Sequence, residues 1–196
     1  MNDRIATVAN HSDKAIKAWA EAAVRSLRIQ LPGKDKTPKI NSLKADQATA
    51  QILAYKKGDI ALGEAIFTRA SCNACHTVST DEAPKGPYLG NIASILRQQD
   101  LVESILMPNK SISQGFATQM ITLKDGKAIM GFVTDESGDS VSMRDISSKE
   151  HSFKKSEIAA RQKLPTSLMP AGLMDNFTIH EFASLIQYLN KLAKQD

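Results

Sequence analysis

The chain of 196 residues has two cysteines, Cys72 and Cys75, and His76 follows directly after the second. Residues three apart lie on the same face of a helical turn, so both thiols can reach one edge of a porphyrin and form thioethers with its two vinyl groups. His76 would then approach the iron from one side. This C-x-x-C-H spacing is typical of a covalently attached c-type haem. We expect Cys72 and Cys75 to attach one haem c and His76 to bind its iron.

Three other interpretations compete with the haem site. A thioredoxin-type redox pair is disfavoured by the histidine that follows and by the lack of a leading βαβ pattern. A structural zinc site needs about four ligands, usually from two such pairs, and the sequence has one pair. The third alternative is a chance match.

Composition fits one domain of ordinary size with an extension. Hydrophobic residues make up 42% of the chain, enough for a core, whereas aromatic residues make up only 5%, a deficit that a large apolar cofactor would partly fill. The net charge of +4 lies in residues 1–50, which hold nine Lys/Arg and five Asp/Glu, while residues 51–196 hold sixteen of each. We therefore expect no nucleic-acid partner.

No stretch approaches the 18 or so consecutive apolar residues of a transmembrane helix, and the first residues lack the apolar region of a secretory signal. Haem c is normally attached outside the cytoplasm. We therefore expect a periplasmic or otherwise extracytoplasmic protein from which a signal peptide or an upstream region has been removed.

Residues 12–31 have the apolar spacing of one amphipathic helix, with Ser12 as N-cap and Pro32-Gly33 as the stop. Residues 33–50 read as an exposed linker, with a short helix toward Ala54. We expect residues 1–56 to be an N-terminal helix plus linker, either docked on the rest or forming the tail of a helical-repeat region.

A haem domain is expected over residues 57–196. Asp59 can cap a helix that runs to about Ala70 and leads into the C-x-x-C-H turn. Thr178 and Glu181 form a capping box that opens a last helix with a clear apolar face. A second capping box, Asp100 with Glu103, predicts a helix that ends before Pro108.

Residues 116–155 are rich in strand-forming residues. Two runs, 116–123 and 127–134, flank a Lys-Asp-Gly hairpin turn, and 140–146 and 151–154 can add two more strands. We predict a small antiparallel sheet of three or four strands at about 116–155, inserted into a mainly α, cytochrome c-like fold around the haem.

An electron-transfer haem needs a second iron ligand, and a methionine there raises the potential relative to a second histidine. The candidates are Met107, Met120, Met130, Met143, Met169, Met174, His11, His151 and His180. Met169 lies in the irregular stretch 164–172 before the last helix, where a loop can cross the open haem face. We choose Met169, with Met174 and Met107 as the alternatives.

The segment 85–89 supports the side of His76. A metal-bound histidine usually donates its other ring N–H to a backbone carbonyl, which fixes the tautomer. We expect the Pro87 carbonyl to be this acceptor and Leu89 to pack on the haem.

With these residues assembled, the chain resembles class I cytochromes c. More closely, residues 58–192 resemble the haem-binding domain at the C-termini of large planctomycete and verrucomicrobial proteins. The matching stretches are 63–67, 100–106, Pro108, 121–126, Gly131, 155–158 and 167–173. Two departures are Tyr88, where the family usually has Asp or Asn, and residues 80–85, which replace a more Gly-rich stretch.

The resemblance implies that the first and last helices cross closely, with Gly63 and Phe67 against Tyr188, and it also places the ligand at Met169. Domains of this kind typically follow a dehydrogenase-like β-propeller, often with helical repeats between. The expected function is a monohaem electron carrier, not an enzyme, that accepts electrons from a dehydrogenase and passes them to a terminal acceptor by outer-sphere transfer.

Two alternatives stay open. One is a five-coordinate haem enzyme or gas sensor whose distal site opens. The other is that residues 116–155 form a docking module for one dehydrogenase.

Overall fold

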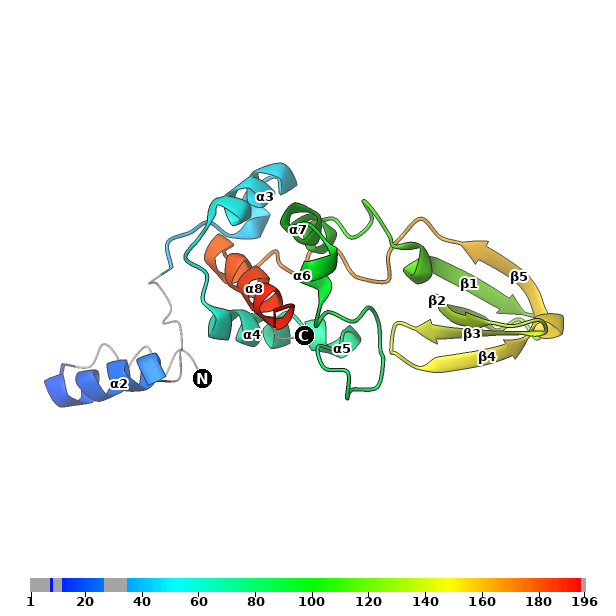
Figure 1. The fold of residues 1–196 in the computed structure, drawn as a ribbon, viewed down its shortest axis with the longest axis horizontal. Helices are drawn as coiled ribbons and strands as arrows, with labels where there is room; N and C mark the ends of the chain where they lie inside the picture. Colours follow the sequence, from blue (N-terminus) through cyan, green and yellow to red (C-terminus); the bar gives the residue numbers. More distant parts are fainter. Residues whose placement is uncertain (1–7, 9–11, 27–34, 195–196) are drawn as a thin grey trace.

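The computed structural model describes residues 8, 12–26 and 35–194. Over these residues the chain forms a helical part and, at one end of it, a β-sheet (Figure 1). The α-helices are α2 (Lys14–Ser26), α3 (Ala45–Ala54), α4 (Ile60–Arg69), α5 (Cys72–Cys75), α6 (Ile92–Ile95), α7 (Gln98–Leu106) and α8 (Ile179–Leu192). Three short 3-10 helices are η1 (Ile40–Ser42), η2 (Gln114–Phe116) and η3 (Lys155–Glu157). No helix among the described residues is long and apolar enough to cross a membrane.

Helices α4 and α8 begin as the sequence predicts. The Asp59 carboxylate accepts a hydrogen bond from the Leu62 N–H at 2.9 Å, and Thr178 and Glu181 form the expected reciprocal capping box. The two helices cross in close contact, with Phe67 and Tyr188 ring centroids 5.8 Å apart. This crossing holds the segment that leads directly into the cysteine turn.

The crossing depends on Gly63. A Cβ at this position would lie 2.0 Å from the Ser184 carbonyl oxygen and 2.7 Å from the Tyr188 Cβ. The backbones therefore approach more closely than any side chain would allow.

The segment before α4 is part of the helical core. Ile40, Ala48 and Ile52 are buried in one cluster with residues of α4, α7 and α8. A bridge between Lys39 and Thr178 joins this segment to the start of α8. The stretch expected to be a linker thus packs on the helices, and the domain boundary at residue 57 stays a prediction.

Two helix starts differ from the prediction. Helix α7 begins at Gln98 with Arg97 as N-cap, because the Asp100 carboxylate pairs with the Arg97 guanidinium at 2.8 Å instead of capping a helix. At α2 the capping side chain is Asp13, which accepts from the Ala15 and Ile16 N–H groups. The predicted continuation of this helix to residue 31 lies outside the described residues.

Five antiparallel strands form the sheet, in the order β4-β3-β2-β1-β5. They are β1 (Thr118–Leu123), β2 (Ala128–Glu136), β3 (Ser140–Asp145), β4 (Glu150–Lys154) and β5 (Ile158–Lys163). Ile121, Ile129, Val141 and Met143 are buried together in a core cluster separate from that of the helices. The sheet therefore has its own hydrophobic core.

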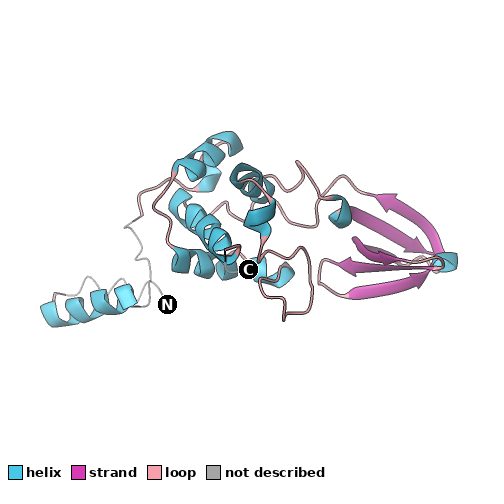
Figure 2. Cartoon of the chain, in the orientation of Figure 1, coloured by secondary structure: helices cyan, strands magenta, loops and turns pink. Residues whose placement is uncertain are grey.

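The expectation of a mainly α fold with a three- or four-stranded sheet is wrong. Helices account for 41% of the residues and strands for 20%, so the fold is mixed α and β. Figure 2 shows the helices and the strands in separate colours. The predicted sheet ends at about residue 155, whereas the observed sheet continues with β5. This edge strand is largely exposed on both faces and contains the helix-forming residues Ala, Arg, Gln and Lys, so it lacks the alternation that identifies a strand.

Candidate cofactor site

The cysteines lie on one short helical turn, α5. The turn is entered through Ser71 in a left-handed conformation, with φ of 59°, and closed by the His76 N–H, which donates to the Cys72 carbonyl at 2.9 Å. Cys72 and Cys75 are free thiols, each half-buried. The turn thus presents two thiols three residues apart, with His76 at its end.

Burial raises the pKa of the Cys72 thiol to about 11. A redox-active C-x-x-C pair needs the opposite shift, because its thiolate is the nucleophile. A thioether sulfur is neutral and apolar and suits such a site. The environment of Cys72 therefore favours covalent attachment of an apolar group over disulfide exchange.

The His76 ring is held by the contact that the sequence predicts. Its Nδ1 lies 2.8 Å from the Pro87 carbonyl oxygen. Since a carbonyl can only accept, Nδ1 carries the proton, and Nε2 keeps its lone pair for a metal. Burial lowers the pKa of His76, although the hydrogen bond to Pro87 works against this shift. The neutral imidazole that a metal requires is thus favoured.

The loop that brings Pro87 to His76 lies directly on the cysteine turn. A Cβ on Gly86 would lie only 2.5 Å from the Cys75 carbonyl oxygen. Lys85 adds a tether from its ammonium to the Asn73 carbonyl at 3.1 Å. Nothing local in the sequence shows this close approach.

Residues 77–89 close back on themselves. The Leu89 N–H donates to the carbonyl of buried Thr77 at 2.9 Å, and the Tyr88 hydroxyl donates to the Val78 carbonyl at 3.3 Å. Tyr88, where the family usually has Asp or Asn, thus forms a hydrogen bond within this loop. Leu89 and Cys72 both pack, half-buried, against the helical core.

The two free thiols on one turn and the oriented, neutral imidazole of His76 fit a covalently attached haem. They do not fit a structural zinc site, since the part of the chain that the structure describes has no group of three or more His, Cys, Asp or Glu able to hold a metal ion.

Residues 60–142 match the family model of cytochrome c. The match supports a c-type cytochrome that binds haem covalently and transfers electrons. It covers the cysteine turn, His76 and residues 85–89, and it ends within β3, before the loop of Met169. Comparison with curated proteins gives no match.

The family match does not identify a second iron ligand for the candidate haem site. Met143 is fully buried in the sheet core and Met174, 2% exposed, in the helical core, so neither can reach a haem without opening a core. Met107 ends α7, where its N–H donates to the Glu103 carbonyl at 2.7 Å. Met130 is 43% exposed on the sheet, opposite Met120.

Met169 is half-buried in the loop between β5 and α8. Its N–H donates to the Ser167 hydroxyl at 3.1 Å. Unlike Met143 and Met174, it belongs to neither core cluster. Its role as iron ligand stays a prediction.

The two histidine candidates within the described residues have other contacts. His151 Nε2 lies 2.7 Å from an Asp145 carboxylate oxygen in the sheet. The His180 ring packs edge-on against Tyr55, with centroids 5.4 Å apart, and its buried Nδ1 has no hydrogen-bond partner among the described residues. His11 lies outside the described residues.

The sheet reaches the candidate haem site through Arg144 of β3. Its guanidinium, 14% exposed, pairs with Glu150 at 3.1 Å and lies 3.5 Å from the Lys85 carbonyl oxygen. This carbonyl immediately precedes Gly86 and Pro87. No local pattern predicts Arg144 as a site residue, because the contact joins segments 59 residues apart.

Proposed function

We propose that this chain contains a monohaem c-type cytochrome domain that transfers electrons by an outer-sphere route. Cys72 and Cys75 attach the haem, His76 and Met169 bind the iron, and Pro87 and Leu89 support the proximal side. A bound haem c supplies an iron that takes up and releases one electron, passing between its ferric and ferrous states.

The observation that carries this proposal is the orientation of His76. Its Nδ1–H is held by the Pro87 carbonyl at 2.8 Å, on a helical turn that presents two thiols. A hydrogen bond of this kind fixes the tautomer and raises the basicity of the ligating nitrogen.

Met169 on the opposite side would fill the last coordination position. With both positions filled, no site remains for a substrate, which favours an electron carrier over an enzyme.

The domain is proposed to be a class I cytochrome of the planctomycete and verrucomicrobial type, with residues 57–196 as the haem domain. On that resemblance, the electron donor is a dehydrogenase and the acceptor is a terminal redox partner. Domains of this family are typically extracytoplasmic, which supports a periplasmic location.

Covalent attachment is tested by a pyridine haemochrome assay on the purified chain. We expect one haem c per chain, and failure to find a covalent haem would end the proposal. Changing both Cys72 and Cys75 to alanine should abolish attachment.

The axial ligand is tested with Met169→Ala. This change should remove the weak sulfur-to-iron charge-transfer band of the oxidised protein, whereas the exposed control Met130→Ala should keep it. If the band survives in Met169→Ala, another methionine is the ligand. Fast, stoichiometric CO binding to the reduced wild-type protein would instead support the five-coordinate enzyme or sensor.

A further inference from the structure

Two loops far apart in the sequence meet beside Met169. One is the turn 107–110 after α7, and the other is the loop 164–178 after β5. The Ser167 N–H donates to the Asn109 Oδ1 at 2.7 Å. Ser167 in turn accepts, through its hydroxyl, from the Met169 N–H at 3.1 Å. The Asn109 side chain is therefore linked to the Met169 backbone through a single residue.

The pairing of β1 with β5 brings these loops together. Gln119 lies opposite Lys163 in the antiparallel register, and the Leu164 N–H donates to the Thr118 carbonyl at 2.9 Å. The chain entering the sheet and the chain leaving it are thus neighbours. Asn109 and Ser167 extend this contact beyond the sheet, although 58 positions separate them.

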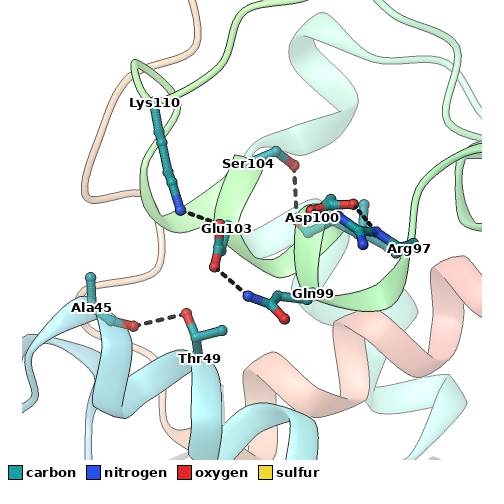
Figure 3. A network of polar contacts seen from close by, with 9 residues as sticks. Ala45, Thr49, Arg97, Gln99, Asp100, Glu103, Ser104 and Lys110 are labelled. Atoms are coloured by element: carbon teal, nitrogen blue, oxygen red, sulfur yellow. Dashed lines mark hydrogen bonds and ion pairs between the residues drawn. The ribbon is translucent and has the colours of Figure 1, made fainter.

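The turn that carries Asn109 is itself tied to α7. The Lys110 N–H donates to the Met107 carbonyl at 2.9 Å, and the Lys110 ammonium pairs with the Glu103 carboxylate. Gln99, one turn earlier, donates to the same carboxylate at 2.9 Å. Figure 3 shows Lys110 reaching back to Glu103 on the helix. The Asn109 amide therefore projects from a turn with a fixed position.

We infer that Asn109 is a positioning residue for Met169. Its side-chain oxygen holds the 167–169 turn against the α7 turn and so keeps the methionine sulfur at the iron. This inference rests on the proposed ligation by Met169. Because Asn109 is exposed, shortening its side chain leaves no cavity, and the effect should concern the loop and not the core.

The experiment uses the full haem-loaded chain and measures the affinity of the ferric protein for imidazole, which must displace the methionine to bind. Asn109→Ala should tighten imidazole binding by about 2- to 10-fold, the equivalent of one net hydrogen bond. Asn109→Asp keeps an acceptor oxygen in place and should restore the wild-type affinity. The control is Ser104→Ala, which removes a 2.8 Å hydrogen bond within α7 itself and should leave the affinity unchanged.

A double-mutant comparison separates positioning from general loosening. In a Met169→Ala background the methionine no longer competes, so adding Asn109→Ala should not change imidazole affinity further. An unchanged affinity in Asn109→Ala alone, or a change that persists without Met169, would overturn the inference. If Met169→Ala keeps the sulfur-to-iron band, the ligand assignment fails; if it loses the band while Asn109→Ala behaves as wild type, only the role of Asn109 fails.

Discussion

Replacing Gly86 with alanine should disturb the hydrogen bond that orients His76. The added Cβ would lie 2.5 Å from the Cys75 carbonyl oxygen, whereas real Cβ contacts essentially never fall below 3.0 Å. Residue 86 must therefore move by about 0.5 Å or more away from the cysteine turn. Pro87 is the next residue, so the same movement would stretch its 2.8 Å contact with His76 to about 3.3 Å, beyond the usual N–H···O range.

The weakening of the hydrogen bond between His76 and Pro87 can be expressed as a change in the reduction potential of the haem. A hydrogen bond is worth about 0.5–1.5 kcal/mol net, and for a one-electron couple about 59 mV corresponds to a tenfold change, or about 1.4 kcal/mol. A His76 that donates more weakly to Pro87 is a poorer electron donor to the iron and stabilises the ferric state less. We expect the midpoint potential to rise by about 20–60 mV.

Spectroelectrochemical titration of the haem-loaded chain measures this shift. The matched control is Gly115→Ala, where a Cβ would meet nothing within 4 Å, and its potential should equal that of the wild type. A Gly86→Ala potential that is unchanged or lower would refute the reasoning, because the loop would then have absorbed the Cβ without moving Pro87.

Three further predictions concern stability. Gly63→Ala overpacks the α4–α8 crossing and should cost about 1–3 kcal/mol in urea unfolding, more than its gain in helix propensity; equal stability would contradict the tight crossing. Met143→Ala empties the sheet core and should cost about 2–5 kcal/mol, while the sulfur-to-iron band persists; loss of the band would mean that Met143 is the ligand. Hydrogen bonds from Ser147 and His151 hold the pKa of Asp145 well below its usual range. That stabilisation is complete above the unfolded pKa of about 3.9 and lost as pH falls below it, so Asp145→Asn should flatten the acid side of the stability curve, and an unchanged curve would contradict it.

Local patterns predicted the elements whose residues determine their own conformation. Asp59 and Thr178 cap helices because their side-chain oxygens accept from N–H groups three residues ahead, so donor and acceptor both lie within one short stretch of sequence. The Lys-Asp-Gly turn likewise joins β1 to β2 as expected, with Gly126 at a φ of 88°.

Elements that depend on a distant partner were missed or misplaced. The fifth strand, β5, exists because β1 offers it an edge, and its own residues favour a helix. Asp100 is a separate case: it looked like an N-cap, but Arg97, only three residues before it, binds its carboxylate. The predicted linker, residues 33–50, contains Ile40 and Ala48, which are buried in the same core cluster as residues of α7 and α8. No local pattern shows this burial.

The same distinction holds at the site. The cysteine turn and His76 follow from five consecutive residues, and Pro87 follows from the general need of a ligating histidine for a backbone acceptor. The close contact of Gly86 can be predicted only when the position of the Cys75 carbonyl is known. The contact of Asn109 with Ser167 can be predicted only when β5 is known to pair with β1. The contact of Arg144 with Lys85 depends on where the whole sheet lies, and no local sequence pattern predicts that.

The sheet is more closely connected to the site than an inserted module would be. On the proximal side, Arg144 of β3 lies 3.5 Å from the carbonyl that precedes Gly86 and Pro87. Elsewhere, the β1–β5 pairing brings together the loops that contain Asn109 and Met169.

Removing residues 116–155 alone would leave β5 without its neighbour β1 and would separate those loops. A loss of electron transfer in that deletion would then reflect displacement of the Met169 loop, the proposed ligand loop, as much as a lost docking surface. Point changes at Arg144 and Asn109 separate these two effects because neither removes a strand: Arg144 contacts Lys85 and Glu150, and Asn109 contacts Ser167.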